Sequence, residues 1–178
     1  MELVFTCFLF PEASVQKKLK SLISKYPDSY LYIPAKYDLA KSYLRAHDND
    51  NAISAFKNII NNHKNTDYEI GSYYYLADLN KEKNIQNSLK YWKDYIYKSQ
   101  DGRFSIDCVN SILKNAKGEL SKDDNYYIGL VYFNNEKYDE AIKYLQNSNE
   151  KLNKIYNDNL NKEKDKFNKL KMSYKNLI

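Results

Sequence analysis

Glycine, proline and cysteine are scarce in this chain of 178 residues, with four, three and two copies. So few turn-forming residues argue against an all-β protein with many tight turns. The two cysteines, Cys7 and Cys108, lie far apart and lack metal-ligand spacing, so they indicate neither a disulfide framework nor a redox motif. No apolar run approaches the roughly 18 residues of a transmembrane helix.

The apolar opening of the sequence, MELVFTCFLF, lacks the positively charged region with which a secretory signal begins. One interpretation is a truncated export signal, which would place the protein in the periplasm or on a membrane anchor. The other is a short N-terminal element that packs on the first helix, and we then expect a cytoplasmic protein by default.

Catalytic motifs are missing as well, because the sequence contains no nucleophile elbow, P-loop or dinucleotide fingerprint. His47 and His63 are predicted to lie in a turn and at a helix end, and neither has ligand-spaced partners. The carboxylate pairs at 123–124 and 139–140 fall at predicted helix starts, where their negative charge interacts favourably with the helix dipole. We therefore expect no enzyme, no catalytic residue, no metal site and no cofactor.

Tyrosine, in contrast, is abundant, with 19 copies. Its ring can line a core while its hydroxyl stays in water, which suits a thin array of two helical layers. The net charge of +5 is concentrated in residues 151–178, so residues 1–150 are neutral overall. A basic tail is most simply a solvated helix face, although it can also attract nucleic acid or an anionic surface.

Internal repeats indicate the fold. In three segments a small residue precedes an aliphatic one, and a large apolar residue follows three positions later; these segments are 51–56, 87–92 and 140–145. Upstream of each segment another small residue occurs, namely Ala40, Ala77 or Gly129. Small residues on facing helices let an antiparallel pair approach closely, and the large residues fill the flanks.

Two strings, YDLAKSYLRAHDNDNAISAFKNII and YYIGLVYFNNEKYDEAIKYL, resemble tetratricopeptide repeats (TPR), helix–turn–helix units of about 34 residues. The second string is the nearer match, through Gly129, Tyr132, Tyr138, Ala141 and Ile142. In the first, HDND stands in the turn where glycine and an aromatic residue are usual in the family. The resemblance implies an all-α, TPR-like α-solenoid of antiparallel helix pairs with a long C-terminal helix.

The same pattern predicts the organisation of the chain. We expect turns within the helix pairs near 46–50, 80–84 and 134–138, and no β-sheet beyond a stub at the N-terminus. The repeat domain is predicted to span 1–156, followed by a Lys-rich C-terminal helix at 157–178. Within the domain we expect a half-repeat at 13–29, repeats at about 33–66, 70–100 and 122–155, and an extra helix at 103–117.

Two of these segments leave alternatives open. The helix at 103–117 is either an insertion or the surviving helix of a decayed repeat. The stretch 138–178 contains no glycine or proline and places apolar residues at steps of three and four. It is predicted to close the solenoid, to project for self-association or docking on a partner, or to be partly disordered around 157–159.

The string KYPDSYLYIPAKYDLAKSYLRAHDNDNAISAF is also similar to repeats of bacterial envelope proteins, among them the outer-membrane assembly lipoprotein (BamD type) and the periplasmic coordinator of cell division (CpoB type). This likeness implies a role in a bacterial envelope assembly. The residues that carry it are Tyr26, Pro27, Asp28, Ser29, Pro34, Ala35, Leu39 and Ala40.

The repeat pattern also predicts which residues form the core. They are Leu39, Ala40, Tyr43, Ala52, Phe56, Leu76, Leu89, Trp92, Ile128, Ala141 and Ile142.

In TPR proteins the first helix of each pair lines a concave groove. The resemblance therefore implies a ligand groove formed by Tyr37, Lys41, Leu44, Arg45, Tyr74, Asp78, Lys81, Tyr126, Leu130 and Phe133. We expect a protein-interaction scaffold that binds a peptide or protein segment there. The alternative is binding of nucleic acid or an anionic surface through the Lys-rich tail, but the neutral charge of residues 1–150 makes nucleic acid the less favoured partner.

Overall fold

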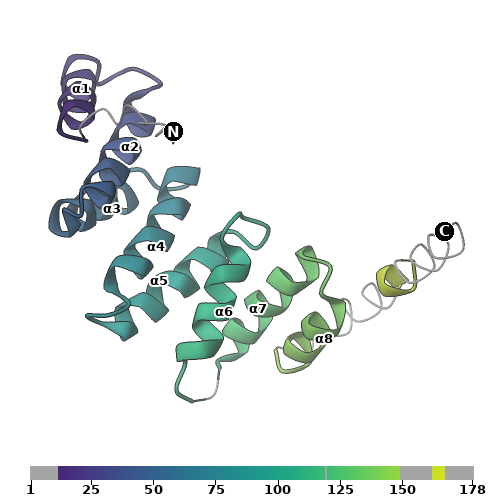
Figure 1. Cartoon of the computed structure of the whole chain (residues 1–178). Coiled ribbons are helices and arrows are strands. Elements are labelled where there is room, and N and C mark those ends of the chain that lie inside the picture. Colours follow the sequence, from purple (N-terminus) through teal and green to yellow (C-terminus); the bar gives the residue numbers. More distant parts are fainter. Residues whose placement is uncertain (1–11, 119, 149–161, 167–178) are drawn as a thin grey trace, which may run out of the picture. The chain divides into compact units, whose positions relative to one another are not determined.

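Short α-helices make up most of the chain (Figure 1). The structure is a computed structural model that describes residues 12–118, 120–148 and 162–166. No strand occurs in these ranges, and the prediction of an all-α fold is confirmed. The helices between residues 12 and 148 are α1 Glu12–Lys25, α2 Tyr32–Arg45, α3 Asn49–Asn62, α4 Asp67–Asn80, α5 Ile85–Lys98, α6 Ser105–Asn115, α7 Lys122–Asn134 and α8 Tyr138–Gln146.

Short polar side chains determine where several helices begin. Asp48 caps α3 and accepts a hydrogen bond from the amide of Asn51 at 3.3 Å. Thr66 caps α4 and accepts one from the amide of Glu69 at 3.1 Å. At α7, Ser121 and Asp124 each accept a hydrogen bond from the other's amide at 3.0 Å, which forms a capping box. These caps satisfy amides that have no partner inside the helix and so fix the first turn.

The three predicted turns are confirmed, since α2 and α3, α4 and α5, and α7 and α8 are joined by residues 46–48, 81–84 and 135–137. In the first and third turns the chain reverses through a left-handed residue, with φ of 58° at His47 and 59° at Glu136. Glycine is usual at such a position because it adopts positive φ without strain. His47 and Glu136 therefore make the same turn with some backbone strain.

The chain divides within α5 into two compact units, residues 1–88 and 89–178. In the first unit α1 packs on α2, α2 on α3 and α3 on α4, and α2 also contacts α4 (Figure 1). In the second unit α6 packs on α7 and α7 on α8. This succession of neighbouring antiparallel helices is that of a TPR-like repeat, as the sequence predicts.

The extra helix predicted at 103–117 is α6. Although α6 separates α5 from α7 in the chain, Lys93 and Tyr97 of α5 both contact Asp124 of α7 at 2.7 Å. Helix α5 therefore contacts α7 directly, although α6 lies between them in the chain.

Most of the predicted core is buried, namely Ala40, Ala52, Phe56, Leu76, Leu89, Trp92, Ile128 and Ala141. The prediction is wrong for Leu39, Tyr43 and Ile142, which are only half-buried. Leu39 and Tyr43 border an open pocket, so neighbouring side chains do not close over them. Ile142 lies one position after the buried Ala141 and is turned by about 100° around α8.

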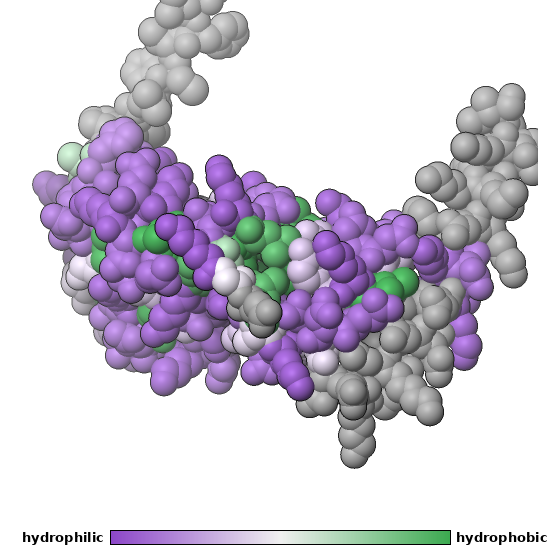
Figure 2. Space-filling view, turned by 90° about the horizontal axis from the view of Figure 1, so that it is seen from below, coloured by the Kyte–Doolittle hydropathy of each residue, from purple (hydrophilic) through white to green (hydrophobic). Residues whose placement is uncertain are grey.

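Several expectations fall outside the described residues, among them the N-terminal segment MELVFTCFLF, the boundary at 156/157 and most of the C-terminal helix. Of that helix only residues 162–166 are described, and they are helical. Among the described helices, none combines the length and the apolar character needed to cross a membrane. The face of the molecule in Figure 2 is largely hydrophilic, with apolar residues in small patches between polar ones.

Candidate binding surfaces

The predicted groove residues lie on the first helix of each pair. They are Tyr37, Lys41, Leu44 and Arg45 on α2, Tyr74 and Asp78 on α4 with Lys81 directly after it, and Tyr126, Leu130 and Phe133 on α7. Helices α2 and α4 contact each other within the first unit, so the first two sets lie on neighbouring helices. The α7 set belongs to the second unit and forms a surface of its own.

Tyr37 belongs to an aromatic cluster that joins three helices. Its ring meets Tyr68 of α4 at a centroid distance of 5.3 Å and Phe56 of α3 at 5.9 Å, both edge to face. Tyr75 of α4 stacks on Phe56 at 5.1 Å. Such aromatic pairs contribute about 0.5–1.5 kcal/mol beyond the burial of their area. Tyr37 is therefore a packing residue, whatever part it takes in binding.

Two glycines allow close contacts between the helices. A Cβ atom on Gly71 of α4 would lie 2.2 Å from the hydroxyl oxygen of Tyr37, which is too close for any residue but glycine. A Cβ atom on Gly129 of α7 would lie 2.6 Å from Cγ of Leu145 on α8. Gly129 thus has the close-approach role that the repeat pattern predicts, and Gly71 is a similar position that the pattern did not reveal.

Arg45 makes a contact that the sequence did not suggest. Its Nε donates to Oε1 of Glu12 at 2.7 Å, which joins the end of α2 to the start of α1. This hydrogen bond raises the pKa of Arg45 above its ordinary value. Because Arg45 is engaged with α1, it is a weaker candidate for ligand binding than its neighbours on α2.

The other charged residues of the predicted groove also have partners nearby. Lys81 pairs with Asp78 at 2.7 Å, and Lys41 lies 3.8 Å from Asp38. Each pair spans three residues along the chain and is exposed, so each contributes at most about 1 kcal/mol. A charged group of a ligand can replace the partner in either of these pairs at little cost in free energy. Lys41, Asp78 and Lys81 are therefore suited to orient a bound segment.

On α7 the three predicted residues are half-buried. Tyr126 contacts the neighbouring Tyr127 at a centroid distance of 5.2 Å, and Phe133 contacts Tyr138 at the start of α8 at 5.8 Å. Large side chains that are partly exposed and held by neighbouring rings are typical anchors of protein-binding surfaces. The α7 set therefore remains a candidate surface of the second unit.

Asp124 is a buried carboxylate whose importance the sequence analysis missed. Lys93 and the Tyr97 hydroxyl donate to its two oxygens, each at 2.7 Å, and the Ser121 amide donates at 3.0 Å. Burial by itself would raise the pKa of Asp124, but the hydrogen bonds from Lys93, Tyr97 and Ser121 outweigh it and lower the pKa. The S-x-x-D spacing at 121–124 is typical of a helix cap, whereas no local pattern points to residues of α5.

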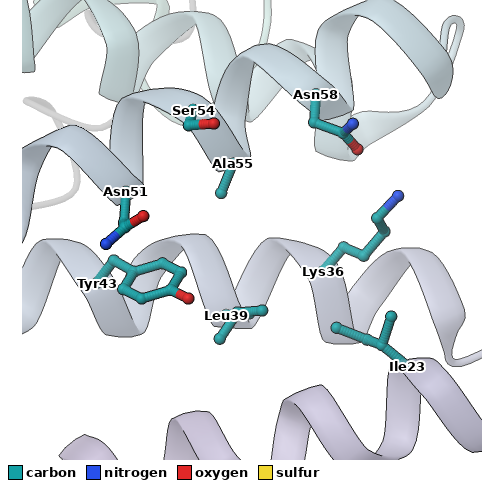
Figure 3. A pocket seen from close by; sticks show the side chains of 8 residues that line it. All are labelled: Ile23, Lys36, Leu39, Tyr43, Asn51, Ser54, Ala55 and Asn58. Carbon is teal, nitrogen blue, oxygen red and sulfur yellow. The ribbon is translucent and has the colours of Figure 1, made fainter.

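A pocket that the sequence did not reveal lies between α1, α2 and α3 in the first unit. Its volume is about 350 Å³. The side chains that line it are Ile23 of α1, Lys36, Leu39 and Tyr43 of α2, and Asn51, Ser54, Ala55 and Asn58 of α3 (Figure 3). At about 100° per residue, the pocket residues of α2 are centred about 130° around that helix from Tyr37, Lys41 and Leu44. Helix α2 therefore contributes to two separate surfaces.

The pocket is positively charged. Lys36 Nζ lies 3.2 Å from Nε2 of His63 and 4.8 Å from the ring centre of Tyr32. Burial and the charge of Lys36 lower the pKa of His63, so its ring is neutral at pH 7. Lys20 of α1 lies 5.4 Å from the ring centre of Tyr43, and no acidic side chain lines the pocket.

Two further observations concern a buried thiol and the grouping of metal-ligating side chains. Cys108 is fully buried in α6, and burial raises the pKa of its thiol, which keeps it protonated. Within residues 12–118, 120–148 and 162–166, no three His, Cys, Asp or Glu side chains gather closely enough to hold a metal ion.

Comparison with known proteins identifies two of the helix pairs. A family model described as tetratricopeptide repeat matches residues 35–66 and 125–150. The first match covers most of α2 and all of α3, and the second covers most of α7 and all of α8. No curated protein matches the chain, and no solved structure matches it either.

Proposed function

Because this chain is a tetratricopeptide repeat protein, a class whose repeats mediate protein–protein interaction, we propose that it is a scaffold that binds a segment of a partner protein on α2 and α4. The observation that carries this proposal is the pair of neighbouring first helices with half-buried large side chains and charged residues beside them. Aromatic and aliphatic anchors with a charged rim provide affinity and orientation in peptide grooves.

Within this surface the residues have different parts. Tyr74 and Leu44 are the anchors, since both are half-buried. The ring of Tyr74 contacts that of its chain neighbour Tyr75 at a centroid distance of 5.6 Å. Lys41, Asp78 and Lys81 orient the segment. Tyr37 supports the surface from below through its aromatic cluster. In the second unit Tyr126, Leu130 and Phe133 offer a separate surface for a partner segment.

A bacterial envelope assembly is the setting that we propose for this scaffold. The support is the likeness of residues 26–40 to the repeats of envelope proteins. Fractionation of cells that express the full natural gene product with a C-terminal tag would test this setting. Recovery of the protein from the periplasm or the membrane fraction would support it, and recovery from the cytoplasm alone would contradict it.

The binding surface is tested with a library of random peptides displayed on phage and selected on the full chain. Selected peptides are then synthesised, and their affinity is measured by fluorescence anisotropy. Tyr74→Ala should weaken binding at least fivefold, which corresponds to about 1 kcal/mol for the loss of an aromatic anchor. Tyr74→Phe is the matched control, because it keeps the ring and should bind nearly as well as the wild type.

A variant with Lys162, Lys164, Lys166 and Lys169 changed to Gln separates this surface from the basic tail. Lys164 pairs with Asp139 and Lys166 with Glu163, so both already have acidic partners within the chain. We expect the tail variant to bind the selected peptides as the wild type does at low and high salt. Loss of binding in the tail variant, with full binding by Tyr74→Ala, would overturn the proposal in favour of the tail.

A further inference from the structure

The pocket between α1, α2 and α3 is lined by both apolar and polar side chains. Its apolar side chains are Ile23, Leu39 and Ala55, one from each helix (Figure 3). All three are half-buried, so they remain accessible to a ligand. Apolar side chains at the base of a hollow, with polar groups along its edge, are typical of sites that bury part of a ligand and fix its orientation.

The polar edge on α3 is a regular stripe. Asn51, Ser54 and Asn58 follow one another at intervals of three and four residues, so they share one side of the helix. At 1.5 Å per residue, Asn51 and Asn58 lie about 10 Å apart along the axis. Three residues of an extended chain span the same distance of about 10 Å.

The chemistry of the stripe matches a peptide backbone. A carboxamide carries both donors and an acceptor, as each peptide unit does. Asn51 uses its Nδ2 to donate to Asp48 at 2.7 Å, which leaves its oxygen as an acceptor. Within the part of the chain that the structure describes, neither Asn58 nor Ser54 makes a side-chain hydrogen bond, so both can serve a ligand.

Charge adds a second requirement for the ligand. Lys36 of α2 lines the pocket, Lys20 of α1 lies 5.4 Å from the ring centre of Tyr43, and the lining contains no carboxylate. Within the described residues Lys36 has no acidic partner, and its nearest polar contact is the neutral ring of His63 at 3.2 Å. A lysine that faces a partly apolar hollow without a carboxylate favours an anionic group from outside.

From these features we propose that the pocket is a second protein-binding site, which takes an extended peptide segment with a carboxylate at Lys36. The peptide backbone lies along Asn51, Ser54 and Asn58, and aliphatic side chains fill the space over Leu39, Ala55 and Ile23. The carboxylate comes from an Asp or Glu side chain or from a chain terminus. The site is distinct from the α2–α4 surface, because it uses a different face of α2.

The test selects random octapeptides, displayed with free C-termini, on the full chain and in parallel on Leu39→Asp and Asn58→Ala. Peptides that depend on the pocket should be lost on Leu39→Asp and weakened roughly tenfold by Asn58→Ala. Asn61→Ala is the matched control on α3, since Asn61 is exposed and outside the pocket. Circular dichroism checks the folding of Leu39→Asp, and Asn58→Ala tests the site without introducing a charge.

A charge reversal gives the sharpest outcome. On Lys36→Glu the selection should change from acidic to basic peptides. Amidation of the C-terminus and replacement of Asp or Glu by its amide then distinguish the two sources of the carboxylate. Binding that is unaffected by both Leu39→Asp and Asn58→Ala, or an unchanged charge preference on Lys36→Glu, would overturn the proposal. Tyr74→Ala should leave these peptides bound, so the test stands apart from that of the α2–α4 surface.

Discussion

The hydroxyl of Tyr37 on α2 occupies the space in which any residue other than glycine at position 71 of α4 would place its Cβ atom, 2.2 Å away. The ring of Tyr37 is itself held by Phe56, Tyr68 and Tyr75. Tyr37 therefore has little room to move, and the spacing of α2 and α4 depends on the absence of a side chain at Gly71.

Gly71→Ala tests this relationship. We expect overpacking to cost roughly 1–3 kcal/mol, partly offset by the gain of about 1 kcal/mol in helix propensity. In a Tyr37→Phe background the nearest ring atom is Cζ at 3.1 Å, so the cost should fall close to zero. Urea unfolding of the four proteins gives the coupling free energy. An equal cost in both backgrounds would show that the hydroxyl is not the obstacle.

Ala52 is fully buried on α3, and its replacement by Leu should destabilise the protein by roughly 1–3 kcal/mol through overpacking. The same result is expected at Ala141 of α8, which is equally buried. Ala55→Leu is the matched control, since Ala55 borders the open pocket and has space beside it. Thermal melts compare the three variants, and a melting temperature unchanged by Ala52→Leu or Ala141→Leu would refute the assigned repeat register.

Asp124→Asn should cost roughly 1–3 kcal/mol, because Lys93 and Tyr97 lose their charged acceptor. The exposed neighbour Asp123 provides the control, and Asp123→Asn should have little effect. Urea unfolding at pH 7 measures both changes. Equal stability of Asp124→Asn and Asp123→Asn would indicate that the contacts with α5 contribute nothing.

The same carboxylate predicts a pH dependence. The pKa of Asp124 is lower in the folded protein than its ordinary 3.8, so its contribution is complete above that value and is lost as the pH falls through the folded pKa. Wild-type stability should therefore decrease more than that of Asp124→Asn between pH 5 and the acid limit of folding, about pH 2–3. Parallel pH profiles of the two proteins would contradict the lowered pKa.

The left-handed turn residues offer a stabilising change. His47→Gly and Glu136→Gly should each raise stability by up to about 1 kcal/mol, since glycine adopts a φ near 58° or 59° without strain. Asn65→Gly is the control, because Asn65 has a φ of 60° but asparagine tolerates this region. Calorimetric melting temperatures rank the variants, and a gain at Asn65 as large as at His47 would argue against strain as the cause.

The turns and the small buried residues could be predicted because they depend on sequence neighbours. The spacing of Ala40 to Ala52 and of Gly129 to Ala141 is that of two helices joined by a short turn, and each pair brings its small residues together whatever surrounds it. The structure confirms the turns at His47 and Glu136 and the burial of these residues.

The pocket and the role of Tyr37 could not be predicted in the same way. Helical spacing shows that Leu39 and Tyr43 face inward, but not whether the facing helices carry side chains large enough to cover them. Opposite them α3 presents Ser54 and Ala55, whose small volume leaves the hollow open. Similarly, Tyr37 and Asp124 contact residues that lie about 20 to 40 positions away in the sequence, and no local periodicity predicts contacts over that separation.

The burial of Cys108 makes its thiol a probe for local opening of α6. A thiol that is enclosed and protonated reacts with a maleimide only while the helix around it has opened. In a Cys7→Ser background, at a maleimide concentration at which labelling is faster than reclosing, the labelling rate therefore gives the rate at which α6 opens under native conditions. Repeating the measurement with a selected peptide bound would show whether peptide binding changes the rate at which α6 opens.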